Sequence, residues 1–216
     1  MSGDSRWITW FCGIRGNEMF CEVDVEFIRD RFNMQDLPTL VPLFDIAVDI
    51  LLNQDAFDED EARAAIAEQS AELLYGLIHA RYILTNRGIS QMVEKWRKLE
   101  FSTCPRFYCE KEGLLPIGLN DLPMESKVKL YCPRCCDLYE PKLRHTHIDG
   151  AYFGTGFPHK LFFVHPEYRP KPPTESFTAR LHGFKIHPTA YELQNQAAEV
   201  AGASEAADVM DTRALE

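Results

Sequence analysis

The sequence predicts an α+β protein, in which a helical N-terminal domain precedes a small domain of short antiparallel strands and an extended C-terminal segment. Three observations predict this order. Apolar residues recur at helical spacing through the first hundred residues, prolines and aromatic residues multiply after Phe101, and Pro170, Pro172 and Pro173 stiffen the chain beyond. We therefore expect domains at residues 1–100 and 101–165, an extended segment at 166–193, and a disordered acidic tail at 194–216.

Four helical segments are expected in the first domain. Asp24 suits the N-cap of a short helix that runs to Phe32, and Pro42 suits the first turn of a second helix. The longest signal covers residues 62–88 and is expected to end at Gly88, and an amphipathic segment follows at 89–101. The apolar stripe predicted for the long helix comprises Ile66, Leu73, Leu74, Leu77, Ile78, Ile83 and Leu84.

The second domain carries short strand signals. The runs KVKLYC at 127–132 and KLFFVH at 160–165 read as strands. The glycine-rich stretch at 150–159 follows no apolar strand and opens no predicted helix, so a phosphate-binding loop fits poorly. We expect a turn-rich loop there, with Tyr152, Phe153 and Phe157 packed on the second domain.

Composition and charge limit the class of protein. The 216-residue chain has a formal charge of −10, which argues against a general nucleic-acid binder because such proteins present a basic surface to phosphates. Seven acids and no base lie from Asp45 to Glu61, whereas residues 126–147 are predominantly basic. Opposed patches of this kind can attract oppositely charged partners. The alternative is that they are solvent-exposed surfaces without a binding role.

Other signals are absent from the sequence. It has no uncharged apolar run of 18 residues, and the N-terminal MSGDSRWITWF lacks the pattern of a secretory signal. We expect neither a membrane span nor secretion. Nucleotide-binding glycine motifs and the HRD and DFG motifs of kinases are also missing, so we expect no enzyme activity of the chain's own.

The cysteines carry the strongest chemical signal. Cys104 and Cys109 form one close pair, and Cys132 and Cys135 form a second, with 22 residues between Cys109 and Cys132. This is the spacing of a zinc ribbon, in which four thiolates bind one Zn²⁺ at roughly 2.3 Å. Because four sulfur ligands leave no open position, the predicted zinc, one per chain, is structural rather than catalytic.

Neighbouring residues leave alternatives to this interpretation. The C-P-x-C turn favours Cys135 as the ligand, and we expect Cys136 to be a small buried side chain. A redox role for CPRC would require a helix that begins at the motif. The sequence instead indicates a strand directly before the motif, which argues against a redox role. His145 and His147 are possible ligands, but four thiolates complete the site, and both are expected on a surface turn.

A zinc-ribbon nucleic-acid or transcription factor is the rival from another class. The net charge of −10 and the acidic loop count against it. Its candidate contacts would be Lys127, Lys129, Arg134, Lys142 and Arg144.

Several long and unusual strings occur along the chain, including WITWFCGIRGNEMFCEVD, LLYGLIHARYILTNRG, CPRFYC, LPIGLND, KLYCPRC, DGAYFGTGFPH, HPEYRPK and GFKIHPTAY. Together they resemble the regulatory (beta) subunit family of protein kinase casein kinase II. The resemblance runs from about Trp7 to Leu193.

This resemblance implies a non-catalytic protein of the cytoplasm and nucleus that dimerises through its zinc domain and carries two catalytic kinase subunits. It also implies modulation of which substrates the kinase reaches. The residues expected in or beside the dimer contact are Pro105, Phe107, Tyr108, Leu138 and Pro141. The segment expected to dock the catalytic subunit contains Arg180, Leu181, His182, Gly183, Phe184 and Ile186.

The chain departs from the family pattern in three places. His182 stands where the family typically has tyrosine, which predicts weaker or pH-dependent binding of the catalytic subunit, as in a diverged paralogue. Ser2 and Ser5 lack the acidic context of the family's phosphorylation site. The acidic loop is short, yet it suits polyamines or basic substrate segments; its residues are Asp55, Asp58, Glu59, Asp60 and Glu61.

Overall fold

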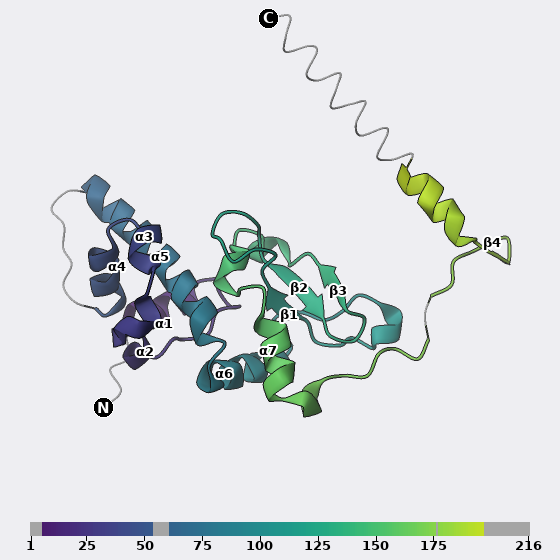
Figure 1. Cartoon of the computed structure of the whole chain (residues 1–216), viewed down its shortest axis with the longest axis horizontal. Helices are drawn as coiled ribbons and strands as arrows, with labels where there is room; N and C mark the ends of the chain where they lie inside the picture. The colour runs from purple at the N-terminus through teal and green to yellow at the C-terminus, as the bar shows by residue number, and fades with distance from the viewer. Residues whose placement is uncertain (1–5, 54–60, 176, 197–216) are drawn as a thin grey trace, which may run out of the picture. The chain divides into compact units, whose positions relative to one another are not determined.

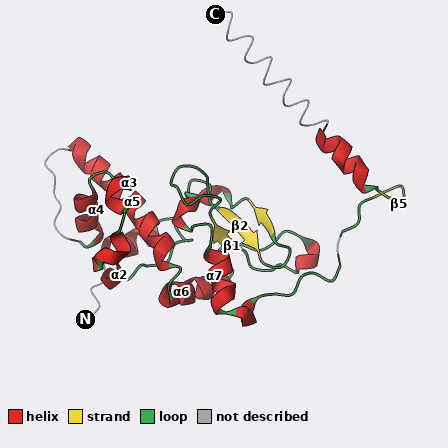
Figure 2. Cartoon of the chain, in the orientation of Figure 1, coloured by secondary structure: helices red, strands yellow, loops and turns green. Residues whose placement is uncertain are grey.

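Helices make up most of the chain before residue 100, and short strands follow (Figures 1 and 2). The structure is a computed structural model that describes residues 6–53, 61–175 and 177–196. It divides into two units, Met1–Pro173 and Thr174–Glu216. The predicted α+β class is confirmed, since helices, short antiparallel strands and a cysteine cluster are all present.

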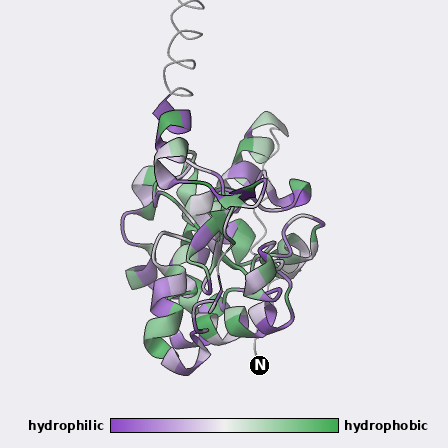
Figure 3. Cartoon of the chain, turned by 90° about the vertical axis from the view of Figure 1, so that its right-hand side faces the viewer, coloured by the Kyte–Doolittle hydropathy of each residue, from purple (hydrophilic) through white to green (hydrophobic). Residues whose placement is uncertain are grey.

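The helical part of the first unit is built around one long central helix. Its elements are α1 (Arg6–Gly13), α2 (Val25–Arg29), the 3₁₀ helix η1 (Arg31–Met34), α3 (Leu37–Leu40), α4 (Phe44–Leu51), α5 (Glu61–Tyr82) and α6 (Asn86–Arg97). Helix α5 packs against α4 and η1. Figure 3 shows hydrophobic (green) and hydrophilic (purple) residues alternating along the helical ribbons, as expected for helices with one buried and one exposed face.

Gly88 does not end the long helix as predicted. Helix α5 ends at Tyr82, and Thr85 caps α6 with its Oγ1 accepting a hydrogen bond from the Gly88 amide at 3.2 Å. Gly88 lies in the first turn of α6, where a Cβ atom would stand 2.2 Å from the Tyr82 carbonyl oxygen. Glycine is therefore needed for close approach of two helix ends rather than for a left-handed cap.

The buried stripe of α5 differs from the predicted one at both ends. Leu74, Leu77, Ile78 and Ile83 are buried, whereas Ile66 is 50% exposed and Leu84 is 41% exposed. In the N-terminal half of α5 the buried face is formed by the small residues Ala67, Ser70 and Ala71, and Ile66 lies outside it.

Two shorter helices also differ from the prediction. Helix α2 ends at Arg29, and the Asp24 carboxylate makes no cap but accepts a hydrogen bond from the Tyr82 hydroxyl at 2.9 Å and pairs with Arg87 at 2.9 Å. Pro42 precedes α4, which begins at Phe44. Asp24 thus stands at the predicted N-cap position of α2, but distant residues occupy its carboxylate, and α4 starts two residues after Pro42.

The cysteine-bearing part contains a three-stranded antiparallel sheet in the order β1 (Leu115–Ile117), β2 (Lys129–Cys132), β3 (Asp137–Tyr139). The predicted strand in KVKLYC is present as β2. Around the sheet lie the 3₁₀ helices η2 (Phe107–Cys109), η3 (Leu143–His145), η4 (Gly150–Tyr152) and η5 (Pro166–Tyr168), together with α7 (Phe157–Val164).

The predicted strand in KLFFVH is wrong, because this run forms most of α7. Gly156 precedes the helix and Pro158 lies in its first turn, where proline's missing amide is tolerated. Phe157 and Leu161, four residues apart, are buried on the side where α7 meets β1. The glycine-rich stretch therefore does open a helix.

Tyr152 and Phe153 pack against the helical part rather than on the cysteine-bearing part alone. The Phe153 ring lies 5.1 Å from the His79 ring and 5.4 Å from that of Phe20, measured between centroids. Buried side chains on both sides of residue 100 consequently belong to one cluster, from Ile8 to Leu161. The change of secondary structure near residue 100 is present, and the four-domain division remains a prediction.

The second unit contains a two-stranded hairpin, β4 (Arg180–Leu181) and β5 (Phe184–Lys185). His182 and Gly183 form its turn with φ values of 49° and 86°, and positive φ at both central residues defines the type I′ turn that suits hairpins. Residues 188–196 are helical. None of the described helices has the length and apolar composition needed to cross a membrane.

Candidate metal centre

The four predicted cysteines lie together. The sulfur atoms of Cys104, Cys109, Cys132 and Cys135 are all within 4.8 Å of one another. The first three side chains are buried and Cys135 is partly buried. Two local turns produce this cluster: Cys109 ends η2, and Cys135 lies in the turn between β2 and β3.

The spacing of the sulfur atoms fits a tetrahedral metal. Metal–sulfur bonds of roughly 2.3 Å place the sulfurs about 3.8 Å apart, and Cys104 Sγ lies 3.9 Å from Cys135 Sγ. In each turn the residue after the second cysteine adopts a left-handed conformation, with φ of 53° at Glu110 and 57° at Cys136. This bend directs the chain away from the sulfur cluster.

Backbone amides point at the sulfur atoms. The amides of Arg134 and Cys135 face Cys132 Sγ, and the amide of Asp137 faces Cys135 Sγ. Burial raises the pKa of Cys109 to about 12 and also raises that of Cys132, where the amides of Arg134 and Cys135 oppose the shift. Burial also acts on Cys135, yet hydrogen bonds from Tyr139, its cysteine neighbours and Asp137 lower its pKa overall. A bound cation would stabilise all four thiolates.

The cysteine cluster and the hairpin lie within a region that matches a known protein family. The sequence model of the casein kinase II regulatory subunit matches residues 6–185. The chain belongs to the casein kinase II regulatory subunit family. Members of this family are non-catalytic, and their partner is a catalytic kinase subunit.

Individual relatives agree with the family match. The chain is 54% identical to "Casein kinase II subunit beta'" of Drosophila melanogaster over 88% of each chain. It is 49% identical to "Casein kinase II subunit beta" of Schizosaccharomyces pombe over 90% of this chain and 85% of that protein. The corresponding subunit of Dictyostelium discoideum is 48% identical over 89% and 73% of the two chains.

The residues predicted for a dimer contact lie close in sequence to the four clustered cysteines. Pro105, Phe107 and Tyr108 lie between the first two cysteines and line a hollow of about 570 Å³. Phe107 is 88% exposed and Leu138 is 45% exposed, whereas Pro141 is buried within the chain. Pro141 can therefore support the surface only from beneath.

The acidic loop lies mostly outside the described residues. Asp55, Asp58, Glu59 and Asp60 are not described, and Glu61 begins α5.

Two predictions about the alternative ligand candidates are wrong. Cys136 is exposed, because the left-handed bend after Cys135 turns its side chain away from the protein. His145 is only 1% exposed, and its Nε2 lies 2.8 Å from the Glu18 carboxylate. Partial burial opposes ionisation of Glu18, yet the hydrogen bond to His145 lowers its pKa to about 2. His147 is exposed, as expected for a surface turn.

The basic residues considered for nucleic-acid binding are largely engaged within the chain. Arg134 pairs with Glu110 at 2.8 Å, and Arg144 approaches Glu18 at 3.8 Å. Lys129 pairs with Glu140, and Lys127 Nζ donates to the His147 carbonyl at 3.1 Å. Carboxylates among these residues reduce the positive potential that phosphates would require.

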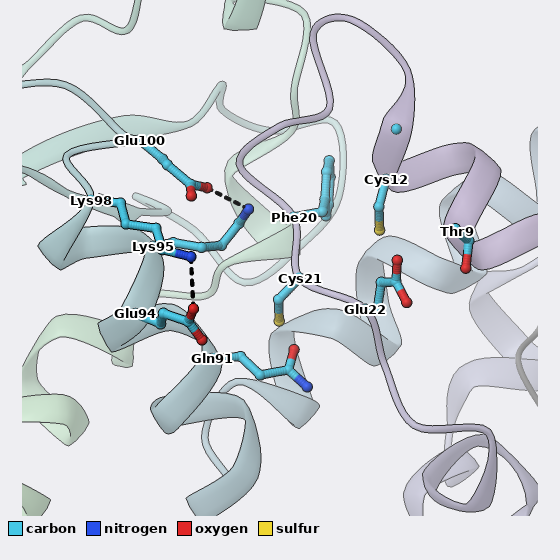
Figure 4. A pocket seen from close by; sticks show the side chains of 11 residues that line it. Thr9, Cys12, Phe20, Cys21, Glu22, Gln91, Glu94, Lys95, Lys98 and Glu100 are labelled. Carbon is cyan, nitrogen blue, oxygen red and sulfur yellow. Dashed lines mark hydrogen bonds and ion pairs between the residues drawn. The ribbon is translucent and has the colours of Figure 1, made fainter. Parts of the chain in front are cut away.

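A second hollow, of about 560 Å³, lies between α1 and α6 and is lined by Cys12 and Cys21 (Figure 4). Its lysines are paired, Lys95 with Glu100 and Lys98 with Glu94, both at 2.7 Å. Burial raises the pKa of Cys12 to about 11 and raises that of Cys21 further. These thiols are protonated at neutral pH, which makes them poor nucleophiles.

His79 lies beneath this hollow and was missed by sequence reasoning. Its Nδ1 donates to the Tyr152 carbonyl at 2.7 Å, and its Nε2 accepts from the Cys21 amide at 3.2 Å, with Cys21 Sγ 3.4 Å away. Although a cysteine and a histidine are neighbours, the amide occupies the lone pair that a general base needs. The pair joins the helical and cysteine-bearing parts and is not an active site.

Because His79 is buried, we expect the folded chain to become less stable in mild acid. Burial lowers its pKa from 6.5 to about 4, so the unfolded chain binds the proton more tightly. The contribution of neutral His79 is complete above pH 6.5 and is lost as pH falls toward 4, by about 3 kcal/mol at most. Urea unfolding between pH 7.5 and 5 should show this loss, and His79→Gln should flatten it. The prediction would be contradicted if His79→Gln kept the wild-type dependence of stability on pH, as the exposed control His147→Gln is expected to do.

Proposed function

We propose that this chain is a zinc-dependent scaffold of casein kinase II that dimerises, holds two catalytic subunits and influences which substrates they reach. The observation that carries the proposal is the cluster of four cysteine sulfurs within 4.8 Å of one another, directly beside exposed apolar side chains. A metal that orders this surface links folding to assembly.

Zinc is the metal best suited to the cluster. Four sulfur donors at tetrahedral spacing match its preferred ligands, and Cys104, Cys109, Cys132 and Cys135 would hold it. When bound, zinc supplies cross-linking of the two turns and no catalysis, since the protein fills all four positions. The small sheet of three short strands has little core of its own to replace that cross-link.

A second copy of the chain is the proposed partner for the surface beside the metal. Phe107 and Leu138 are exposed there, and Pro105 and Tyr108 extend the same hollow. Exposed aromatic and aliphatic groups of this kind are typical anchors of homodimer interfaces. The family resemblance supports the same assignment.

The hairpin at residues 180–185 is proposed to dock the catalytic subunit. Leu181 is 63% exposed and Phe184 is 79% exposed, and the turn between them is preorganised by its positive φ values. The Arg180 side chain donates to the Gly183 carbonyl at 3.1 Å, and the Ile186 amide donates to the Ala179 carbonyl at 3.1 Å. A rigid hairpin with apolar side chains loses little conformational entropy on binding.

The remaining parts of the proposal rest on the family resemblance and composition. The acidic loop, with Asp55, Asp58, Glu59, Asp60 and Glu61, would attract polyamines or basic substrate segments. The cytoplasm and nucleus are the proposed locations.

The docking proposal is tested by titrating a purified catalytic subunit against the full-length chain. Phe184→Ala should weaken binding by about 30-fold, as expected for a lost anchor worth about 2 kcal/mol. Phe177→Ala is the matched control, because Phe177 is 81% exposed in the same unit but lies outside the hairpin.

His182→Tyr should tighten binding if histidine weakens the contact. Equal affinity of wild type and Phe184→Ala would refute docking through the hairpin, and equal affinity of wild type and His182→Tyr would refute the role of His182.

A further inference from the structure

Tyr139 places its hydroxyl group against two of the four clustered sulfurs. The oxygen lies 3.3 Å from Cys135 Sγ and 3.5 Å from Cys104 Sγ. Cys104 belongs to the first cysteine pair and Cys135 to the second. One phenol group therefore reaches both turns that make the site.

The strand register fixes this position. Residues directly opposite in an antiparallel pair share a face of the sheet, and β3 pairs with β2 so that Tyr139 faces Leu130 and Asp137 faces Cys132. Tyr139 thus lies on the face that carries Cys132. Tyr131 pairs with Leu138 and lies on the opposite face, so the two tyrosines of neighbouring strands have different surroundings.

The hydroxyl group has one hydrogen and can donate it to one sulfur at a time. A metal-bound thiolate carries negative charge and accepts a stronger hydrogen bond than a thiol does. Such a bond withdraws charge from the sulfur and holds it in position, which reduces its reactivity toward electrophiles. Cys135 has most to gain, because it is the one member of the cluster that is not fully buried.

We propose that Tyr139 is a positioning residue of the metal centre: its hydroxyl donates to the Cys135 thiolate and slows loss of zinc. This inference rests on the proposed zinc site and adds to it a residue that is not a ligand. The tyrosine is not needed to join the turns in the folded chain, because two surface ion pairs, Arg106 with Asp137 and Arg134 with Glu110, also connect them.

The test compares Tyr139→Phe with Tyr131→Phe in the full-length chain. Both changes remove one hydroxyl from a partly buried ring in the same sheet, but the Tyr131 hydroxyl faces Cys136, outside the cluster. Cobalt(II) replaces zinc, and the sulfur-to-cobalt charge-transfer band is recorded. Zinc transfer to a chelator and the rate of alkylation by N-ethylmaleimide are measured on the zinc-loaded proteins.

Tyr139→Phe should move the charge-transfer band to lower energy, because a sulfur without the hydrogen bond gives up an electron more readily. It should also lower zinc affinity by about tenfold and speed alkylation several-fold, whereas Tyr131→Phe changes none of these. Replacing Tyr139 with 3-fluorotyrosine, a stronger donor, should move the band the other way. This second variant keeps the test valid should Tyr139→Phe fold poorly.

The outcomes separate the inference from the proposed function. Identical bands, affinities and alkylation rates for Tyr139→Phe and Tyr131→Phe, with cobalt still bound by four thiolates, overturn the role of Tyr139 alone. Failure of the wild-type chain to bind cobalt or zinc through thiolates overturns the metal site and the inference together.

Discussion

Replacing Cys135 with serine is expected to remove the metal and break the dimer, whereas replacing the adjacent Cys136 leaves both intact. Cys135 Sγ belongs to the four-sulfur cluster, and Cys136 is exposed with a backbone bend that points it elsewhere. Losing one of four ligands abolishes tight binding, because a serine hydroxyl is a poor zinc ligand at neutral pH.

The size of the effect follows from mass action. At free zinc a thousandfold above its dissociation constant, binding stabilises the fold by about 4 kcal/mol, and Cys135→Ser forfeits this contribution. Metal analysis after dialysis should give one zinc per chain for wild type and Cys136→Ser and almost none for Cys135→Ser. Sedimentation should then show dimers for the first two proteins and monomers for the third.

Either of two results would contradict this expectation. A full-strength dimer from Cys135→Ser without zinc would separate dimerisation from the metal. Equal zinc loss from both variants would mean that Cys136 shares the site, contrary to the position of its side chain.

Gly88→Ala is expected to destabilise the chain strongly even though alanine favours helices. A Cβ atom at residue 88 would lie 2.2 Å from the Tyr82 oxygen and 2.7 Å from the Ile83 Cα, and both are backbone atoms that cannot rotate away. The close approach of α5 and α6 would have to open, at a cost on the order of 2–3 kcal/mol.

Thermal unfolding measures this cost. For a chain of this size the melting temperature should fall by roughly 4–12 °C. Gly13→Ala is the matched control, since a Cβ atom at Gly13, the last residue of α1, meets nothing within 4 Å. It should unfold at the wild-type temperature. A wild-type melting temperature for Gly88→Ala would show that the helix ends are farther apart than the structure has them.

The cysteine cluster was predictable because each cysteine pair is local. A turn of four to six residues brings two sulfurs together, and tetrahedral coordination then requires the two pairs to meet. Cys136 was not predictable in the same way. Its exposure depends on a left-handed φ at a residue other than glycine, which composition does not signal.

Burial of the histidines was also beyond the sequence patterns. His145 is buried against Glu18, and His79 against the Tyr152 carbonyl and the Cys21 amide, all far away along the chain. The KLFFVH run shows a different difficulty, because four consecutive apolar or aromatic residues fit a strand and a buried helix equally. Its helix is set upstream, where Gly156 precedes the helix and Pro158 lies in the first turn.

The contact between Glu18 and His145, together with the tilted packing of the Phe20 ring on that of Phe153, has a consequence for synthesis of the chain. Glu18 and His145 are separated by 127 residues along the chain. At about 5–20 residues per second, a ribosome needs about 6–25 s to deliver the second partner after the first. The apolar N-terminal segment remains exposed during that interval, so we expect chaperones that bind nascent chains to bind this protein early in its synthesis.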